Sequence, residues 1–375
     1  MKKLSQLPKL ASARVLIRVD YNVPLEGNRI RDTRRIVASF ETINAVIKKG
    51  GTPVLIAHLG KGSDTLRPIA TFLSKTYKTV FVTNDIADAR TIEILNAVPN
   101  GTVILLENIR RYPGEESNDK IFAKTLARLG AYYVNDAFSV SHRAHASIVG
   151  LPKLLPSYGG AQLVREITSL SKALTNKKHP SLFILGGAKF GTKIPLIKKF
   201  ITTSDYVVIA GAILNNFLLV AGFSVGASVV EKGFDVPIKK LLKSEKLLLP
   251  IDLLVLHDNK AVVTTPDEIL SKDVIVDIGP QSIALITKKI LMAKAIIWNG
   301  PTGWYEKGYT KATVALARAI DMSKAHTVIG GGDTGAVVEK ILGTSNNKNI
   351  FVSTGGGAAL DYLSSGKPPG IIALK

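Results

Sequence analysis

The sequence predicts an α/β protein built from two doubly wound parallel-sheet lobes, which are joined by a helix and a hinge. Three observations lead to this prediction. The 375 residues exceed what one ordinary hydrophobic core needs. Short apolar runs alternate with helical stretches almost throughout, and a segment rich in proline and glycine divides the chain near its middle. Because helices connect the strands of a parallel sheet, this alternation is typical of Rossmann-like lobes.

The predicted strands are short apolar runs with little alternation of apolar and polar residues. This is the pattern of strands that are covered on both faces of a parallel sheet. The runs are Val15–Val19, Val54–Ala57, Thr79–Val82, Val103–Leu106, Tyr132–Asn135, Leu182–Leu185, Tyr206–Ala210, Ala295–Trp298, Thr327–Ile329 and Ile350–Val352. The helical stretches between them include Thr33–Lys48, Asp119–Arg128, Leu163–Leu174 and Thr310–Ala319.

The segment Tyr206–Val230 carries no charged residue and is long enough to cross a membrane. Asn215-Asn216 and several glycines interrupt it, however. We therefore predict a buried strand, a turn, a helix at Leu214–Ala221 and a short final strand rather than a membrane span. The boundary between the lobes is predicted at Gly150–Gly160, the segment rich in proline and glycine.

The composition limits the classes of function. A formal charge of +20 attracts polyanions such as nucleic acid, a membrane surface or small phosphorylated substrates. The lysines are scattered in pairs, so a basic nucleic-acid arm is not predicted. The absence of cysteine excludes disulfides, thiolate metal sites and a cysteine nucleophile. It also suits a reducing cytosol, and the first residues lack the apolar stretch of a signal peptide.

Polar residues that follow the predicted strands are informative, because ligands of a parallel sheet bind beyond the carboxyl ends of its strands. In the first half of the chain these residues are mostly basic or hydrogen-bonding. They predict a site for a small, highly anionic substrate, because arginine matches phosphate and carboxylate groups with paired hydrogen bonds. The candidates are Asp20, Asn22, His58, Lys61, Arg110, His142 and Arg143.

In the second half the same positions are rich in glycine. Glycine lets backbone N–H groups approach an anion, and the start of a following helix adds a favourable dipole. Glycine turns after five strands of one lobe predict a site for the phosphates of a nucleotide. The turns are Gly186–Lys189, Gly211–Ala212, Gly300–Gly303, Gly330–Thr334 and Gly355–Gly357, with candidate positions Gly187, Gly211, Ala212, Pro301, Gly303 and Gly332.

Two lysines and an aspartate accompany these turns. Lys189 and Lys193 are four residues apart, so on a helix they share a face and can reach one phosphate. Asp333 opens a helix after a glycine turn. It could cap that helix, or it could hold Mg²⁺, which favours one carboxylate together with phosphate oxygens.

Two alternative functions rest on single features. Gly330–Gly335 matches the G-x-G-x-x-G pattern of dinucleotide-binding folds, which suggests a nicotinamide-dependent oxidoreductase. That pattern needs an acidic residue about 20 positions further on, at the end of the next strand. Ile350–Val352 continues into Ser353-Thr354-Gly355 instead. The second alternative, a nucleic-acid-binding protein, is suggested by the positive charge of the chain alone.

In their order and spacing, the motifs together resemble phosphoglycerate kinase. The resemblance runs nearly end to end and is more specific than any one motif. The motifs are RVDYNVP (18–24), AHLGK (57–61), LENIR (106–110), NDAFSVSHRAHAS (135–147), GGAKFGTK (186–193), DIGP (277–280), WNGPTGWYE (298–306), GGGDT (330–334) and STGGGAALDYLSSGKPPG (353–370).

The resemblance implies reversible in-line phosphoryl transfer between 1,3-bisphosphoglycerate with ADP and 3-phosphoglycerate with ATP, in glycolysis and gluconeogenesis. It implies that Mg²⁺ accompanies the nucleotide and that a hinge closes. In the first lobe it implies 3-phosphoglycerate at Asp20, Asn22, Arg35, His58, Arg110 and Arg143. Arg35 takes this role when DTRRI is aligned on Ile36, and Arg34 is the rival.

In the second lobe the resemblance assigns the nucleotide to Lys189, Asn299 and Glu306, with Glu306 on the ribose. Asp333 would hold the metal and Thr334 a phosphate. The groups expected to act on the transferring phosphoryl group are Arg35, Lys193, Gly355 and Gly356.

The expected organisation follows from these roles. Residues 1–157 would form the 3-phosphoglycerate lobe, 158–176 the interlobe helix and 177–361 the nucleotide lobe, with the tail 362–375 packing back on the first lobe. We expect a cytoplasmic monomer whose partners are its two substrates, without an obligate nucleic acid or a membrane.

The chain also departs from the family pattern. Lys61 stands where the family has arginine, which keeps the charge but loses the paired donors. Ser139-Val140 replaces a usual Gly-Thr, and Thr192, Ala212 and Asp361 replace Asp, Gly and Glu. These changes bear on substrate affinity and on lobe closure rather than on the reaction.

Overall fold

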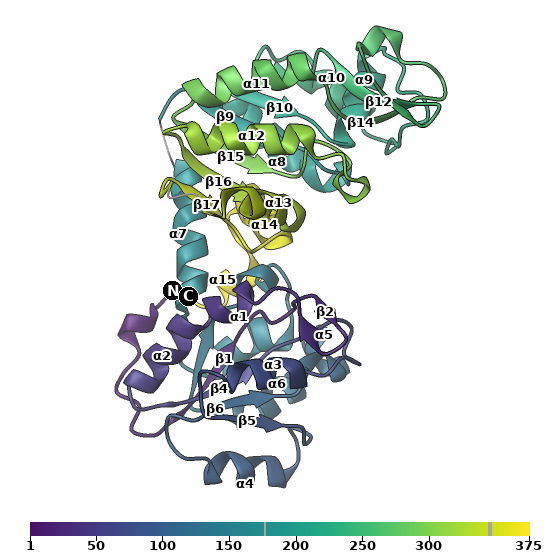
Figure 1. The fold of residues 1–375 in the computed structure, drawn as a ribbon. Helices are drawn as coiled ribbons and strands as arrows, with labels where there is room; N and C mark the ends of the chain where they lie inside the picture. The colour runs from purple at the N-terminus through teal and green to yellow at the C-terminus, as the bar shows by residue number, and fades with distance from the viewer. Residues whose placement is uncertain (176–177, 344–346) are drawn as a thin grey trace. The chain divides into compact units, whose positions relative to one another are not determined.

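The computed structural model describes residues 1–175, 178–343 and 347–375 of the chain (Figure 1). They divide into two compact units. Unit 1 is Met1–Thr168 together with Ser365–Lys375, and unit 2 is Ser169–Ser364. The predicted lobe limits at 157, 176 and 361 stay predictions, and residues 176 and 177 lie outside the described part.

Unit 1 is built on a six-stranded parallel sheet in the order β5-β6-β4-β1-β7-β8. The middle strands are almost wholly buried, as their unbroken apolar runs predict. The strands are β1 (Arg14–Arg18), β4 (Thr52–Ile56), β5 (Thr79–Val82), β6 (Val103–Leu106), β7 (Tyr132–Asn135) and β8 (Ser157–Gly159). Between β4 and β7, β1 is the point where the strand order reverses, and ligands of such sheets bind beside that point.

Helices flank this sheet, as Figure 1 shows. They are α1 (Arg34–Ala38), α2 (Phe40–Lys48), α3 (Arg67–Leu73), α4 (Ala89–Ala97), α5 (Pro113–Glu116), α6 (Lys120–Ala127), the first half of α7 (Ala161–Thr175) and α15 (Pro369–Ile372). Predicted as one helix, Thr33–Lys48 is interrupted at Ser39 instead. The Ser39 hydroxyl lies 2.7 Å from the Ile36 carbonyl oxygen and donates to it, and serine hydroxyls of this kind compete with helical backbone bonding.

The end of the chain belongs to unit 1. The Gly370 N–H donates to the Ser141 carbonyl at 2.8 Å, and a Cβ at Gly370 would lie 2.6 Å from the Ile148 side chain. Ala373 packs on a small apolar cluster formed by Ala137, Val140, Ile148 and Val149. Residues from both ends of the sequence therefore complete one unit.

Unit 2 repeats the architecture, with a parallel sheet in the order β11-β10-β9-β15-β16-β17. Strand order reverses at β9, which pairs with β10 on one side and β15 on the other. The strands are β9 (Ser181–Leu185), β10 (Tyr206–Ile209), β11 (Leu247–Leu248), β15 (Ala295–Asn299), β16 (His326–Gly330) and β17 (Ile350–Val352). The helices are the rest of α7, α8 (Phe190–Thr203), α9 (Ile213–Ala221), α10 (Asp235–Leu241), α11 (Pro280–Met292), α12 (Lys311–Met322), α13 (Gly332–Leu342) and α14 (Gly357–Ser365). The predicted fold class, two parallel-sheet lobes of α/β type, is confirmed.

Two small antiparallel elements were not predicted from the sequence. In unit 2, β13 (Lys260–Thr264), β12 (Leu253–His257) and β14 (Val274–Ile278) form a three-stranded sheet. In unit 1, β2 (Leu25–Glu26) pairs with β3 (Arg29–Ile30). Much of β13 is exposed, so it lacks the continuous apolar run that marks the parallel strands.

The uncharged segment Tyr206–Val230 forms β10 and α9, but the short final strand predicted for it is wrong. The amides of Asn215 and Asn216 explain the difference. They donate to the carbonyl oxygens of Val229 and Glu231 at 2.9 and 2.6 Å, so side chains take acceptors that a strand neighbour would use. Among the described residues, no helix is long and apolar enough to cross a membrane.

Candidate active site

The first candidate site lies at the carboxyl ends of the unit 1 strands, beside the reversal at β1. Asp20 and Asn22 follow β1, His58 follows β4, Arg110 follows β6, and the segment Ser139–Arg143 follows β7. These segments lie far apart in the sequence. Parallel pairing of β4, β1 and β7 brings three of them to one edge.

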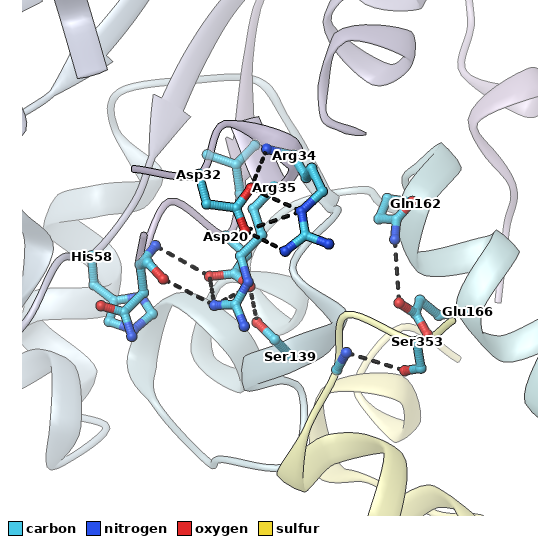
Figure 2. Close-up of polar contacts among 12 residues, drawn as sticks. Asp20, Asp32, Arg34, Arg35, His58, Ser139, Gln162, Glu166 and Ser353 are labelled. Atoms are coloured by element: carbon cyan, nitrogen blue, oxygen red, sulfur yellow. Dashed lines mark hydrogen bonds and ion pairs between the residues drawn. The ribbon is translucent and has the colours of Figure 1, made fainter. Parts of the chain in front are cut away.

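Two neighbouring arginines of α1 make different contacts. Arg35 Nη1 lies 3.2 Å from Asp20 Oδ2 and donates to the Asn22 carbonyl at 3.0 Å. Arg34 instead pairs with Asp32, with Nη2 2.5 Å from Oδ2. Figure 2 shows the two side chains reaching these separate carboxylates. Arg35, and not its rival Arg34, therefore lies among the residues predicted to bind substrate.

Ser139 joins the same group of side chains. Its hydroxyl donates to Asp20 Oδ2 at 2.5 Å, as Figure 2 shows. Oδ2 of Asp20 thus contacts both Arg35 and Ser139. Sequence reasoning noted Ser139 only as a departure from the family pattern and gave it no role.

Asn22 and Arg110 meet at Gly60, in the loop after β4. The Gly60 N–H donates to Asn22 Oδ1 at 3.1 Å, and Arg110 Nη1 donates to the Gly60 carbonyl at 2.6 Å. Arg110 Nε also lies 3.3 Å from Glu116 Oε1. The next residue in the loop, Lys61, has an exposed side chain.

His58 is buried in a positive environment. Its Nδ1 lies 3.1 Å from Nη2 of Arg18, another buried residue. Burial lowers the pKa of His58 far below its usual value, and the charges of Arg18, Arg110 and Arg143 lower it further. The imidazole is therefore neutral at pH 7, and the positive charge of the site comes from its arginines and lysine.

Behind these residues lies a buried group that sequence reasoning missed. It consists of Arg18, Glu115 and Ser147, none of which is more than 1% exposed. The sequence offered one signal, because Arg18 is the single charged residue in the predicted strand Val15–Val19. Its partner Ser147 is 129 positions away, so no local pattern connects the two.

The second candidate site is a pocket of about 680 Å³ within unit 2. Its lining contains most of the predicted nucleotide-binding residues, together with an apolar wall from β14, Leu214 and Trp304. Such a combination of apolar surface and a few polar groups is typical of small-molecule sites. The predicted residues in the lining are Gly187, Lys189, Lys193, Gly211, Ala212, Asn299, Pro301, Gly303, Glu306, Thr334 and Gly356.

Two glycine loops that contribute to the lining of this pocket, after β9 and β15, pack against one another. Gly186 N–H donates to the Asn299 carbonyl at 2.8 Å, and Gly187 N–H donates to the Pro301 carbonyl at 2.7 Å. A Cβ at Gly300 would lie 2.2 Å from the Gly186 oxygen, and Gly300 has a φ of +87°. Only glycine allows the β9 and β15 loops to come this close.

Three polar side-chain atoms of the pocket are buried and, among the described residues, have no hydrogen-bond partner. They are Asn215 Oδ1, Asn299 Nδ2 and Thr334 Oγ1. A buried polar atom without a partner is costly, and in a pocket a bound ligand can supply the missing bond. Asn299 Nδ2 and Thr334 Oγ1 can both donate, so they fit the oxygens of a phosphate group.

Lys193 lies on α8, with its ammonium hydrogen-bonded to the Gly186 carbonyl, and its side chain is buried. Lys189 precedes α8 with a φ of +61°. The carboxylate of Glu231 accepts from the N–H groups of Phe190 and Gly191 at 2.6 and 3.2 Å, so it caps the start of the helix. The helix that carries Lys193 is therefore anchored at its first turn.

The remaining predicted positions lie at the starts of α13 and α14. Gly332 and Asp333 open α13, but their side-chain environment lies outside the described part, so neither reading of Asp333 is tested. Gly356 lines the pocket, whereas the Gly355 N–H donates to Ser353 Oγ at 3.1 Å. Within the described residues, no group of three or more acidic or histidine side chains could hold a metal ion.

A family model described as phosphoglycerate kinase matches residues 4–367. The chain belongs to the phosphoglycerate kinase family. The phosphoglycerate kinase of Methylorubrum extorquens (strain PA1) is 40% identical over 395 residues, which cover 100% of this chain and 98% of that protein. That of Wolbachia sp. subsp. Brugia malayi (strain TRS) is 37% identical over 383 residues, and the match covers 96% of this chain and 95% of that protein.

Solved structures of the phosphoglycerate kinase family agree with this assignment. The enzyme from Coxiella burnetii has a TM-score of 0.85 at 34% identity, and the match covers 99% of this chain and 97% of that one. The enzyme from Pyrococcus horikoshii OT3 has a TM-score of 0.86 at 27% identity, and the match covers 100% of this chain and 98% of that one. The chain is thus a phosphotransferase of glycolysis, as predicted, and neither the oxidoreductase nor the nucleic-acid hypothesis has support.

Proposed function

We propose that unit 1 binds 3-phosphoglycerate and unit 2 binds ATP, and that the phosphoryl group passes directly between them. The observation that carries this proposal is the contrast between the two strand-end sites. Unit 1 gathers arginines around Asp20 and Asn22, whereas unit 2 has a pocket with glycine loops and unpaired donors. The proposed substrate residues are Asp20, Asn22, Arg35, His58, Lys61, Arg110, His142 and Arg143.

Catalysis then rests on positioning and on neutralising the charge of the transferring group. Arg35 supplies paired donors from unit 1, and Lys193 supplies a positive charge from α8. Gly356 supplies a backbone N–H near the start of α14, where the helix dipole favours an anion. No phosphoenzyme forms in this mechanism. The hinge closure expected from the sequence remains part of the proposal.

Mg²⁺ is the proposed metal, and Asp333 is the residue that would hold it. When bound with the nucleotide, Mg²⁺ neutralises phosphate charge. Asn299 and Thr334 would donate to phosphate oxygens beside it, which fits their unpaired buried atoms. A monomeric state and a cytoplasmic location also remain proposals.

The test is turnover of 3-phosphoglycerate and Mg-ATP, coupled to a dehydrogenase that reduces the product. We expect Arg35→Ala to lower kcat on the order of 10³-fold, by analogy with other arginines that serve phosphoryl transfer. Arg34→Ala is the matched control, because its ion pair with Asp32 is half exposed and such pairs contribute about 0–1 kcal/mol. A loss below tenfold in Arg35→Ala, or equal losses in both variants, would remove Arg35 from the transition state.

The metal assignment has its own test. Asp333→Asn should weaken Mg-nucleotide binding and raise the Mg²⁺ concentration needed for half-maximal turnover, with little change in the KM for 3-phosphoglycerate. Titration calorimetry with Mg-ADP measures the first effect directly. If the metal dependence of Asp333→Asn equals that of the unmodified protein, Asp333 only caps α13.

A further inference from the structure

Glu115 is a carboxylate in the short helix α5 with 0% of its surface exposed. A buried carboxylate is stable only when hydrogen bonds satisfy it. Both of its oxygens accept from one residue: Oε1 from the Ser147 hydroxyl at 2.6 Å and Oε2 from the Ser147 N–H at 2.9 Å. His145 Nδ1 lies further away, 3.8 Å from Oε1.

Ser147 connects Glu115 to Arg18 through its hydroxyl, which bonds to both residues. Because the Ser147 hydroxyl gives its only proton to Glu115, its oxygen is free to accept, and Arg18 Nε donates to it at 2.9 Å. Burial lowers the pKa of Arg18, and the nearby charge of Glu115 opposes that effect. Arg18 also donates through Nη1 to the Val19 carbonyl at 2.5 Å, which fixes the plane of the guanidinium.

The Nη2 group of Arg18 determines which ring nitrogen of His58 carries the proton. A guanidinium has donors only, so His58 Nδ1 must accept from Arg18 Nη2 across their 3.1 Å contact. The neutral ring then carries its proton on Nε2, the nitrogen on the opposite side. A neutral histidine with a fixed Nε2–H is a donor that needs no change of charge when an anionic ligand arrives.

We propose that Glu115 is a positioning residue of the unit 1 site. Together with Ser147 it holds Arg18, and Arg18 fixes His58 as the Nε2–H tautomer that donates to the bound substrate. The last step rests on the proposed function, since it takes 3-phosphoglycerate as the ligand. We call the chain of hydrogen bonds from Glu115 through Ser147 and Arg18 to His58 the relay. It is a property of the free protein and can be measured without any ligand.

The decisive measurement is a long-range ¹H–¹⁵N correlation spectrum of the ligand-free protein labelled at histidine, which distinguishes protonated from unprotonated ring nitrogens. His58→Gln identifies the His58 signals among the six histidines. We expect a protonated Nε2 and an unprotonated Nδ1 in the unmodified protein. Ser147→Ala removes the link between Arg18 and Glu115, and Glu115→Gln removes its charge, so both should move His58 toward a mixture of tautomers.

Ser117→Ala is the matched control, because Ser117 is an exposed serine next to α5 whose hydroxyl bonds only locally, to the Pro113 carbonyl. It should leave the His58 spectrum unchanged. In steady-state assays, Ser147→Ala and Glu115→Gln should raise the KM for 3-phosphoglycerate about tenfold, which is the loss of affinity expected when one hydrogen bond to a charged group is lost. The KM for Mg-ATP should stay unchanged.

A protonated Nδ1 in the unmodified protein would overturn the proposal, and this reading needs no variant to fold. It would also be overturned if His58 kept the same spectrum in folded Ser147→Ala and Glu115→Gln. If the tautomer shifts as expected while the unmodified protein does not turn over 3-phosphoglycerate, the relay stands and the proposed substrate is wrong.

Discussion

The loop packing beneath the unit 2 pocket makes a quantitative prediction about Gly300. A methyl group there would meet the Gly186 oxygen at 2.2 Å, and φ is +87°. The backbone conformation alone costs about 1–2 kcal/mol for alanine. To relieve the overlap, the β9 and β15 loops must separate, which weakens the Gly186–Asn299 and Gly187–Pro301 hydrogen bonds at about 1 kcal/mol each. Gly300→Ala should therefore destabilise unit 2 by about 3–4 kcal/mol.

Gly222 provides the matched control. It has a φ of +100° at the end of α9, but a Cβ at this position would have no neighbour within 4 Å. Gly222→Ala should therefore lower the stability of unit 2 only by the backbone-conformation cost of about 1–2 kcal/mol. Near 200 residues, each kcal/mol lowers Tm by about 2–4 °C. We expect losses of about 10 °C for Gly300→Ala and about 4 °C for Gly222→Ala by scanning calorimetry.

The transition of unit 2 is identified as the one that Mg-ADP raises, since a ligand stabilises the unit that binds it. Gly300→Ala should also raise the KM for Mg-ATP, because the displaced loops carry Gly187 and Pro301 of the pocket lining. Equal Tm losses in the two variants would refute the reasoning. They would show that the loops accommodate a side chain and that close packing is not what restricts Gly300.

Two further predictions concern unit 1. Ser139→Gly removes the hydroxyl that donates to Asp20 and should raise the KM for 3-phosphoglycerate up to about tenfold in the coupled assay. An unchanged KM would mean that Asp20 does not need this hydroxyl to bind the substrate. Asp136 caps α7 by accepting from the N–H groups of Gln162 and Leu163, and burial raises the pKa of its carboxyl to about 7. Since an unfolded aspartate titrates near 4, native unit 1 binds the extra proton between about pH 4 and 7, and its stability falls as the pH rises through that range. Urea unfolding of Asp136→Asn should show a flatter pH dependence there, and equal slopes in variant and unmodified protein would contradict the burial effect.

The parallel sheets were predictable because their strands are buried on both faces and read as short apolar runs. The limits of Val103–Leu106 and Ile350–Val352 agree with β6 and β17. The antiparallel strand β13 was missed because its side chains are mostly exposed and leave no apolar run. Helix Thr33–Lys48 was predicted unbroken because helical periodicity does not register a serine that bonds back to its own helix.

The site residues predicted from strand ends share one property, since they follow strands directly and the topology of parallel sheets brings such residues together. The residues that were missed lie behind them. Glu115 lies in the short helix α5 and Ser147 in a single turn of π-helix at Ala146–Gly150, and each matters only through a partner distant in sequence. Pairing of that kind has no periodicity, so it becomes visible only when the chain is folded.

The return of the tail to unit 1 has a consequence for the order in which the units are completed during synthesis. Unit 2 is inserted between the two segments of unit 1, and Gly370 and Ala373 are needed to cover Ile148 and its neighbours. On the ribosome, domains generally fold from the N-terminus onward as they are made. Here all of unit 2 is translated before unit 1 can close its apolar cluster, so the half that is begun first is finished last.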